Sequence, residues 1–301
     1  MYDQVGQNRR RSFLLMGAFV LLTGLVVAAV LYLVGVGSLG LLLAAAIALG
    51  ATWISYWKSD AVALRISRAV EADPTTYARY HNLVEGLCIA GGLPKPRLYV
   101  IDDVAPNAFA TGRDPKNAAI AVTTGLLEQM DRVELEAVLA HELSHIKNRD
   151  ILVGTLAVTM VGLITLLADW LLRLLWWNGG RLGRNDRQGG AAPILGIFGV
   201  AILVLSPLLA SLLKFAVGRR RESLADMSAV ELTRYPPGLI SALEKLRDDS
   251  TVVHAGVRAT AHLWIESPVA TAEPEGRLSR WNRMFDTHPP IEERIAALRE
   301  L

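Results

Sequence analysis

Residues 131–150 read DRVELEAVLAHELSHIKNRD, and this stretch sets both a local fold and the chemistry that it can support. Its opening Asp, with a Glu three residues later, is the pattern of a capping box at the start of a helix. His141 and His145 are four residues apart, so both imidazoles leave the same face of that helix. Glu142 can reach a water on an ion that the two rings share. The pattern predicts two zinc ligands and a general base, although a surface helix can carry these residues by chance.

A catalytic zinc site needs a third protein ligand and leaves its fourth position to water. Residues 218–226 read GRRRESLAD and place Glu222 and Asp226 four apart, on one face of a helix. We expect Glu222 to bind the metal. We expect Asp226 to accept the remaining N–H of a ligating imidazole, that of His141, which fixes its tautomer. The alternative is a solvated helix face of mixed charge.

Composition narrows the class of protein. The chain has 301 residues, 52% of them hydrophobic, and a mean hydropathy of +0.33, which is high for a wholly soluble protein. Its 31 basic and 29 acidic side chains give a net charge of +2, so we expect no nucleic-acid partner. Cys88 is the only cysteine, which excludes an intramolecular disulfide and a cysteine-rich zinc site.

Long apolar runs predict membrane segments. Residues 13–57 contain no charge, and the glycines at 35–40 divide the run into two candidate spans, 14–34 and 40–57. The run is too long for the apolar core of a signal peptide. We therefore interpret it as a membrane hairpin that ends in an aromatic belt.

A second apolar pair covers 151–177 and 191–213, joined by the polar loop 178–188. Asp169 and Arg173 make its first segment the weaker candidate, so this segment crosses the bilayer incompletely or lies partly in the interface. Most of the flanking positive charge falls on one side, which predicts that both termini face the cytoplasm.

These runs define the expected domains. Residues 1–57 and 151–217 form two membrane hairpins, and residues 58–150 and 218–301 together form one cytoplasmic domain with its own core. Residues 97–101 and 118–122 are β-prone runs between turn residues, and 266–287 reads as a loop. The fold class is therefore mainly α with a small β-sheet. Helices are expected at 60–72, 76–90, 133–148, 219–233, 237–248 and 290–300.

In the order and spacing of its motifs, the chain resembles the HtpX-like membrane zinc metalloproteases over nearly all of its length. The resemblance rests on the two apolar pairs and the two motifs above, on PNAFATG at 106–112, and on THPPIEER at 287–294. It implies a multi-pass protein of the cell inner membrane that carries one Zn²⁺ in a zincin-like domain on the cytoplasmic side. It further implies an endopeptidase of stress response and quality control, which contacts lipid and cleaves misfolded or damaged membrane proteins. Gly218 and Ser223 depart from the family pattern, but neither is a ligand position.

The resemblance also suggests substrate and catalytic contacts. Asn107, Ala108 and Phe109 would lie on or beside an edge strand that binds an extended peptide by strand addition. The alternative is a hairpin turn with Phe109 in the core. His288 would donate a hydrogen bond to the tetrahedral intermediate, unless it belongs to an ordinary helix start.

Two other functions remain open at this point. A CAAX-type prenyl-protein endopeptidase shares the catalytic pattern, but such enzymes carry more spans than this chain offers. A non-catalytic membrane scaffold would hold structural zinc or none. Structural sites usually have four protein ligands, whereas this chain offers three and an adjacent Glu142 as a base, which favours catalysis.

Overall fold

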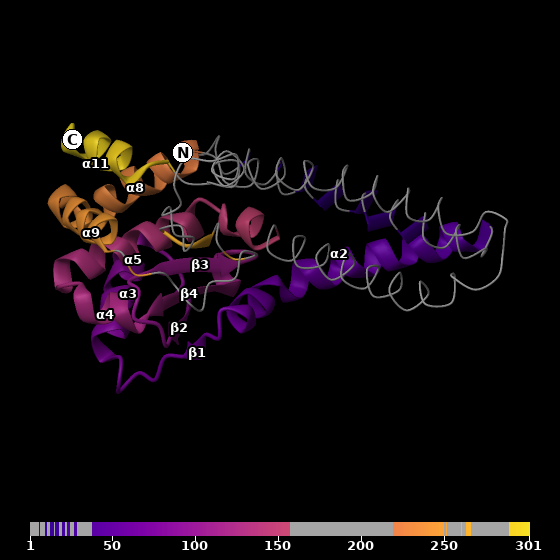
Figure 1. Cartoon of the computed structure of the whole chain (residues 1–301), viewed down its shortest axis with the longest axis horizontal. Coiled ribbons are helices and arrows are strands. Elements are labelled where there is room, and N and C mark those ends of the chain that lie inside the picture. The colour runs from indigo at the N-terminus through magenta and orange to yellow at the C-terminus, as the bar shows by residue number, and fades with distance from the viewer. Residues whose placement is uncertain are drawn as a thin grey trace, which may run out of the picture.

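The computed structural model describes residues 38–156, 219–249, 251, 260, 263–265 and 289–301, together with individual positions between residues 6 and 28. Within these residues the chain is mainly helical with one small mixed sheet, as the sequence predicts. A long helix, α2, extends away from the sheet and the other helices (Figure 1).

The sheet has four strands in the order β1-β2-β4-β3. The two strands expected from the sequence, β2 (Arg97–Ile101) and β4 (Ala118–Thr123), pair in parallel at its centre. β1 (Val70–Glu71) and β3 (Ala108–Gly112) join antiparallel at the two edges. Every residue of β3 and β4 is buried, so neither strand shows the polar alternation of a half-exposed sheet.

The expected helices of the polar segments are present, apart from shifts at their ends and the exception described below. A short helix that the sequence did not suggest, α4, starts directly after β4, where the Thr123 side chain accepts from the Leu126 N–H. The helices of the domain that the structure describes are α3 (Ala78–Gly91), α4 (Thr124–Gln129), α5 (Arg132–Lys147), α8 (Arg219–Thr233), α9 (Pro236–Asp248) and α11 (Ile291–Arg299).

Helix α5 lies at the centre of the domain, where it contacts α8, α9, α3 and β3. The predicted capping box starts it. The Asp131 carboxylate accepts from the N–H groups of Val133 at 2.8 Å and Glu134 at 2.9 Å, and Glu134 accepts from the Asp131 N–H at 2.9 Å. Nearly the whole helix beyond its first turn is buried, so its polar residues face protein rather than solvent.

Helix α2 (Ser38–Ile66) differs from expectation. It joins the predicted segment 40–57 to the first residues of the helix expected at 60–72, and it ends at Ile66. The expectation of a helix through residue 72 was wrong, because Arg68 takes a positive φ of 53° and the chain turns into β1. Among the residues that the structure describes, no helix is long and apolar enough to cross a membrane.

Several expectations fall outside the described residues. The segments 157–177, 178–188 and 191–213, with Asp169 and Arg173, are among them, as are the loop 266–287 and His288.

Candidate metal centre

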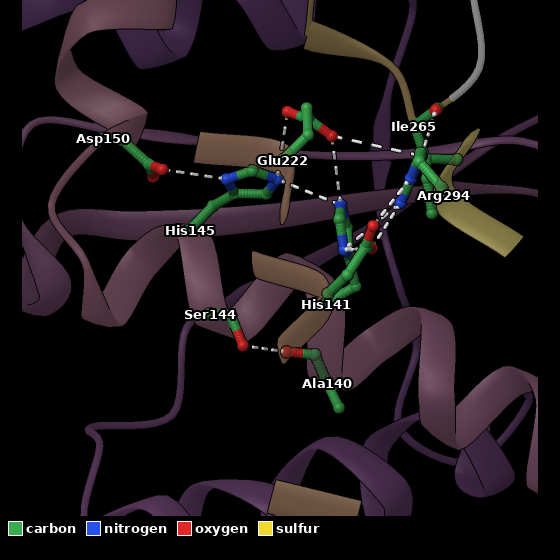
Figure 2. A network of polar contacts seen from close by, with 9 residues as sticks. Ala140, His141, Ser144, His145, Asp150, Glu222, Ile265 and Arg294 are labelled. Atoms are coloured by element: carbon green, nitrogen blue, oxygen red, sulfur yellow. Dashed lines mark hydrogen bonds and ion pairs between the residues drawn. The ribbon is translucent and has the colours of Figure 1, made fainter. Parts of the chain in front are cut away.

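Two imidazoles from α5 and one carboxylate from α8 meet at a single point (Figure 2). Nε2 of His141 lies 3.1 Å from Nε2 of His145. The Glu222 carboxylate lies 3.6 Å from Nε2 of His141 and 3.8 Å from Nε2 of His145. A tetrahedral zinc bound at about 2.1 Å separates its ligand atoms by about 3.4 Å, so the three side chains fit one ion.

The other nitrogen of each ring is held by a carboxylate. Nδ1 of His141 lies 2.9 Å from Asp226, and Nδ1 of His145 lies 3.1 Å from Asp150, just beyond the end of α5. Each Nδ1–H donates to its carboxylate, so each Nε2 keeps its lone pair for the shared point. The structure thus places Asp226 where the sequence suggested. Asp150 is a second partner of the same kind that the sequence reasoning missed.

A buried arginine holds Asp226 in turn. Nε and a terminal nitrogen of Arg294, on α11, donate to its two oxygens at 2.9 and 2.6 Å. Burial raises the pKa of Asp226, but Arg294 and His141 outweigh it and hold that pKa at about 2. The carboxylate therefore stays ionised and fixed in orientation, and α11 joins the ligand helices to the end of the chain.

The electrostatics of the pocket favour a cation. Burial lowers the pKa of both histidines, yet the surrounding carboxylates reverse the effect. Asp226 and Glu222 raise the pKa of His141. Asp150 and Glu222 raise the pKa of His145 to about 10. Positive charge at the ring nitrogens is therefore favoured, and a divalent ion at Nε2 would supply it. Two histidines with one glutamate are a donor set that catalytic zinc uses.

Glu142 lies beside this centre and is 1% exposed. Its charge contributes to the raised pKa of His145. It also raises the pKa of Tyr80 on α3, where burial has the larger effect. The Glu142 carboxylate is thus within electrostatic reach of the metal-binding face, in a pocket that excludes bulk water.

The region expected to bind substrate is buried from both sides. Phe109 lies in the core, with its ring edge-on to Trp264 at 4.9 Å, and Asn107 accepts from the Ala108 N–H. The Ala108 carbonyl points away from β4 and accepts from the Ile265 N–H at 2.9 Å. A segment of this chain therefore covers the first residue of the β3 edge.

The next outward position on that edge is Ala110. Outward and inward residues alternate along β3, and at its far end the Gly112 N–H donates to the Thr155 hydroxyl. The backbone N–H and C=O of Ala110 thus face the edge between these two contacts. Within the described part of the chain, no hydrogen bond reaches either group.

The sequence analysis did not single out Arg294 or Asp150, although the sequence held a weak indication of each. Arg294 stands in the quoted stretch 287–294, but nothing local says that its guanidinium is buried. Asp150 ends the quoted stretch 131–150, five residues after His145, a spacing that requires the chain to leave the helix first. Arg221, which directly precedes Glu222 on α8, is 7% exposed.

A centre with two helical histidines, a distant glutamate and a buried neighbouring glutamate is that of a zinc metallopeptidase. Comparison with known proteins gives the family. The chain belongs to peptidase family M48, whose family model matches residues 74–301. It is therefore a metalloprotease, and zinc is its cofactor.

Full-length relatives carry the description protease HtpX homolog. The chain is 40% identical to that of Thermoanaerobacter pseudethanolicus over 301 residues, which cover 100% of this chain and 98% of the relative. It is 42% identical to that of Dictyoglomus thermophilum, over 99% and 94% of the two chains. It is 39% identical to that of Ligilactobacillus salivarius, over the whole of both. A solved structure, Ste24p of S. mikatae, is similar at a TM-score of 0.46 and 19% identity, over 82% of this chain and 58% of that chain.

Proposed function

We propose that this metalloprotease is a membrane endopeptidase whose zinc is held by His141, His145 and Glu222, with Glu142 as its general base. The observation that carries this assignment is the convergence of the three ligand atoms within 4.8 Å of one another. The carboxylate partners on both Nδ1 atoms support it, because they leave both Nε2 atoms available to one ion.

In this mechanism zinc, when bound, acts as a Lewis acid toward the scissile carbonyl and the attacking water. Glu142 takes the proton from that water and passes it to the leaving amine. Burial suits the carboxylate to this task, since it removes competing water. Asp226 and Asp150 keep both imidazoles in the required tautomer throughout. His288 donates to the developing oxyanion in this proposal.

We infer that an extended polypeptide binds along the β3 edge by strand addition, beside Asn107, Ala108 and Phe109. The outward backbone groups of Ala110 supply the donor and acceptor that such a strand needs. Ile265 marks the limit of the edge at Ala108. Recognition of main chain rather than side chains suits substrates that share no sequence, such as misfolded or damaged membrane proteins in quality control.

The membrane setting is proposed from two features. Residues 13–57 carry no charge, and helix α2 exposes many large apolar side chains. We place residues 1–57 and 151–217 in the inner membrane as hairpins, with both termini and the domain of residues 58–150 and 218–301 in the cytoplasm. The large apolar side chains that α2 exposes are Leu39, Leu42, Leu43, Ile47, Leu49, Trp53, Ile54, Trp57 and Val62.

The test compares wild type with Glu142→Gln, purified in detergent and loaded with zinc. Gln keeps the shape of the side chain but cannot accept a proton, so the variant should bind zinc normally and lose cleavage of an unfolded membrane protein by at least about 100-fold. Glu136→Gln, an exchange outside the metal-binding face of the same helix, is the control. Wild-type cleavage by Glu142→Gln would refute the assignment of the base, and efficient cleavage of a prenylated peptide alone would favour the CAAX-type alternative.

A further inference from the structure

A cavity of about 770 Å³, lined by none of the three candidate metal ligands, lies where the N-terminal segment and α2 meet the globular domain. Most of its apolar lining comes from the N-terminal segment and α2 and includes Phe13, Met16, Leu49 and Trp53, while Pro94 and Leu152 add apolar surface from elsewhere. Its other wall is the turn after β3, residues 113–117, together with Arg149. The cavity thus has an apolar side and a polar side, contributed by different parts of the chain.

The polar side is cationic. Arg113, Lys116 and Arg149 line it with one carboxylate, that of Asp114. Asp114 accepts from two backbone N–H groups of its own turn and from the Asn117 amide, and its Oδ2 lies 3.6 Å from Nε of Arg113. Arg113 is therefore partly neutralised, and Lys116 and Arg149 carry most of the free positive charge. Lys116 and Arg149 are exposed, and no carboxylate in the described part of the chain pairs with either. The cavity wall therefore offers positive charge to a ligand.

Aromatic rings mark the boundary between the two sides. The Arg113 guanidinium stacks 4.6 Å above the Trp57 ring, and Trp53 and Tyr56 pack against Trp57 near the middle of α2. Trp and Tyr are enriched at the level of lipid head groups, and basic pockets at that level bind anionic lipid. The positive charge of the cavity, its apolar lining and its aromatic rings, which are typical of the head-group level, therefore favour one class of ligand, an anionic lipid.

We propose that this cavity binds one anionic glycerophospholipid, with its phosphate against Lys116, Arg149 and Arg113 and its upper acyl carbons against α2. The inference rests on the membrane setting proposed above. The site would connect the bilayer to two segments of the catalytic domain. The turn 113–117 directly follows β3, and Arg149 precedes Asp150, the partner of His145.

Native mass spectrometry of the full-length, zinc-loaded protein in detergent tests the proposal. Dioleoyl phosphatidylglycerol and dioleoyl phosphatidylcholine are titrated separately. Each cation near a head group is worth roughly a fivefold change in affinity, so the wild type should prefer phosphatidylglycerol by about tenfold or more. The variant Lys116→Gln with Arg149→Gln should lose about 25-fold for phosphatidylglycerol and little for phosphatidylcholine, and it should keep one zinc.

A matched control exists for both changes. Arg132 and Arg234 are exposed arginines with no ion pair in the described residues, and Arg234 shares the positive φ of Arg149. Arg132→Gln with Arg234→Gln should therefore leave lipid binding unchanged. Equal affinities for the two lipids would overturn the proposal, as would an equal loss in both double variants or displacement of the lipid by excess inorganic phosphate. Because cleavage is measured separately, equal affinities in a protein that still cleaves would remove the lipid site and leave the proposed function standing.

Discussion

Nδ1 of His141 lies 2.9 Å from Asp226, and this one contact determines which ring nitrogen faces Glu222. Without the carboxylate, the ring can carry its proton on either nitrogen and can turn away from the ligand position. The affinity for zinc therefore depends on a residue that does not touch the ion.

Asp226→Asn tests this dependence. The amide cannot hold the imidazolium-like charge of a ligating ring, so we expect zinc affinity to fall by roughly 10- to 100-fold, as for other partners of metal-bound histidines. Competition with a chromophoric chelator measures it. Glu231→Gln, an exposed change on the same helix, is the control, and equal affinities in the two variants would contradict the role of Asp226.

We expect substitution of Arg294 to act mainly by lowering the stability of the folded protein. Its side chain is buried and pairs with Asp226, so Arg294→Met leaves a buried carboxylate without its partner. We expect a loss of roughly 3–5 kcal/mol in the free energy of unfolding, seen as a large drop in apparent Tm. Arg294→Lys should recover only part of it, because an ammonium cannot donate to both oxygens in a fork.

The exposed Arg299 on the same helix gives the comparison. It pairs with Glu244 at the surface, so Arg299→Gln should change the unfolding free energy by less than about 0.5 kcal/mol. If Arg294→Met unfolds no earlier than Arg299→Gln, the buried pair does not hold α11 to the ligand helices.

The edge of β3 can be tested through its backbone. Ala110→Pro removes the outward N–H without breaking the ladder to β4, since proline is tolerated on the open side of an edge strand. We expect KM for an unfolded protein to rise roughly 5- to 10-fold with zinc content unchanged. Ala110→Gly keeps the N–H and serves as the control, and a wild-type KM in the proline variant would exclude strand addition at this residue.

We expect low pH to destabilise the first turn of α5, because Glu134 becomes protonated. Burial raises the pKa of this carboxyl, but Lys245, Ser241 and the Asp131 N–H outweigh it and hold the pKa below its ordinary value. A lowered folded-state pKa stabilises the protein above the unfolded value of about 4.3, and this stability is lost as pH falls through the folded pKa.

Glu134→Gln removes this titration while it keeps an acceptor for the capping box. We expect the wild type to lose about 1 kcal/mol more than the variant between pH 6 and pH 3.5, measured by thermal unfolding at each pH. Parallel pH profiles of the two proteins would show that Glu134 does not contribute in this way.

The sequence predicted the elements whose signals are local. The capping box of Asp131, the four-residue spacing of His141 and His145, and that of Glu222 and Asp226 all depend on the geometry of a single helix. The strands β2 and β4 followed from β-prone runs between turn residues. That α5 and α8 lie side by side was an inference from chemistry, since two histidines need a third ligand.

The remainder depended on tertiary contacts that no local pattern carries. Ile265, far along the chain, donates a hydrogen bond to the edge of β3. Arg294 can be buried only because its guanidinium pairs with Asp226. Helix α2 continues past Trp57 because its end is set where the chain turns into β1, not where its apolar run stops.

The zinc content of Glu222→Ala tests the central claim most directly. The measurement is metal per chain by inductively coupled plasma mass spectrometry, after equilibration at a buffered low concentration of free zinc, beside wild type and Glu231→Gln. Loss of one of three ligands should reduce zinc from about one per chain to well below one half, while both comparison proteins stay near one. A full zinc complement in Glu222→Ala would contradict the three-residue centre.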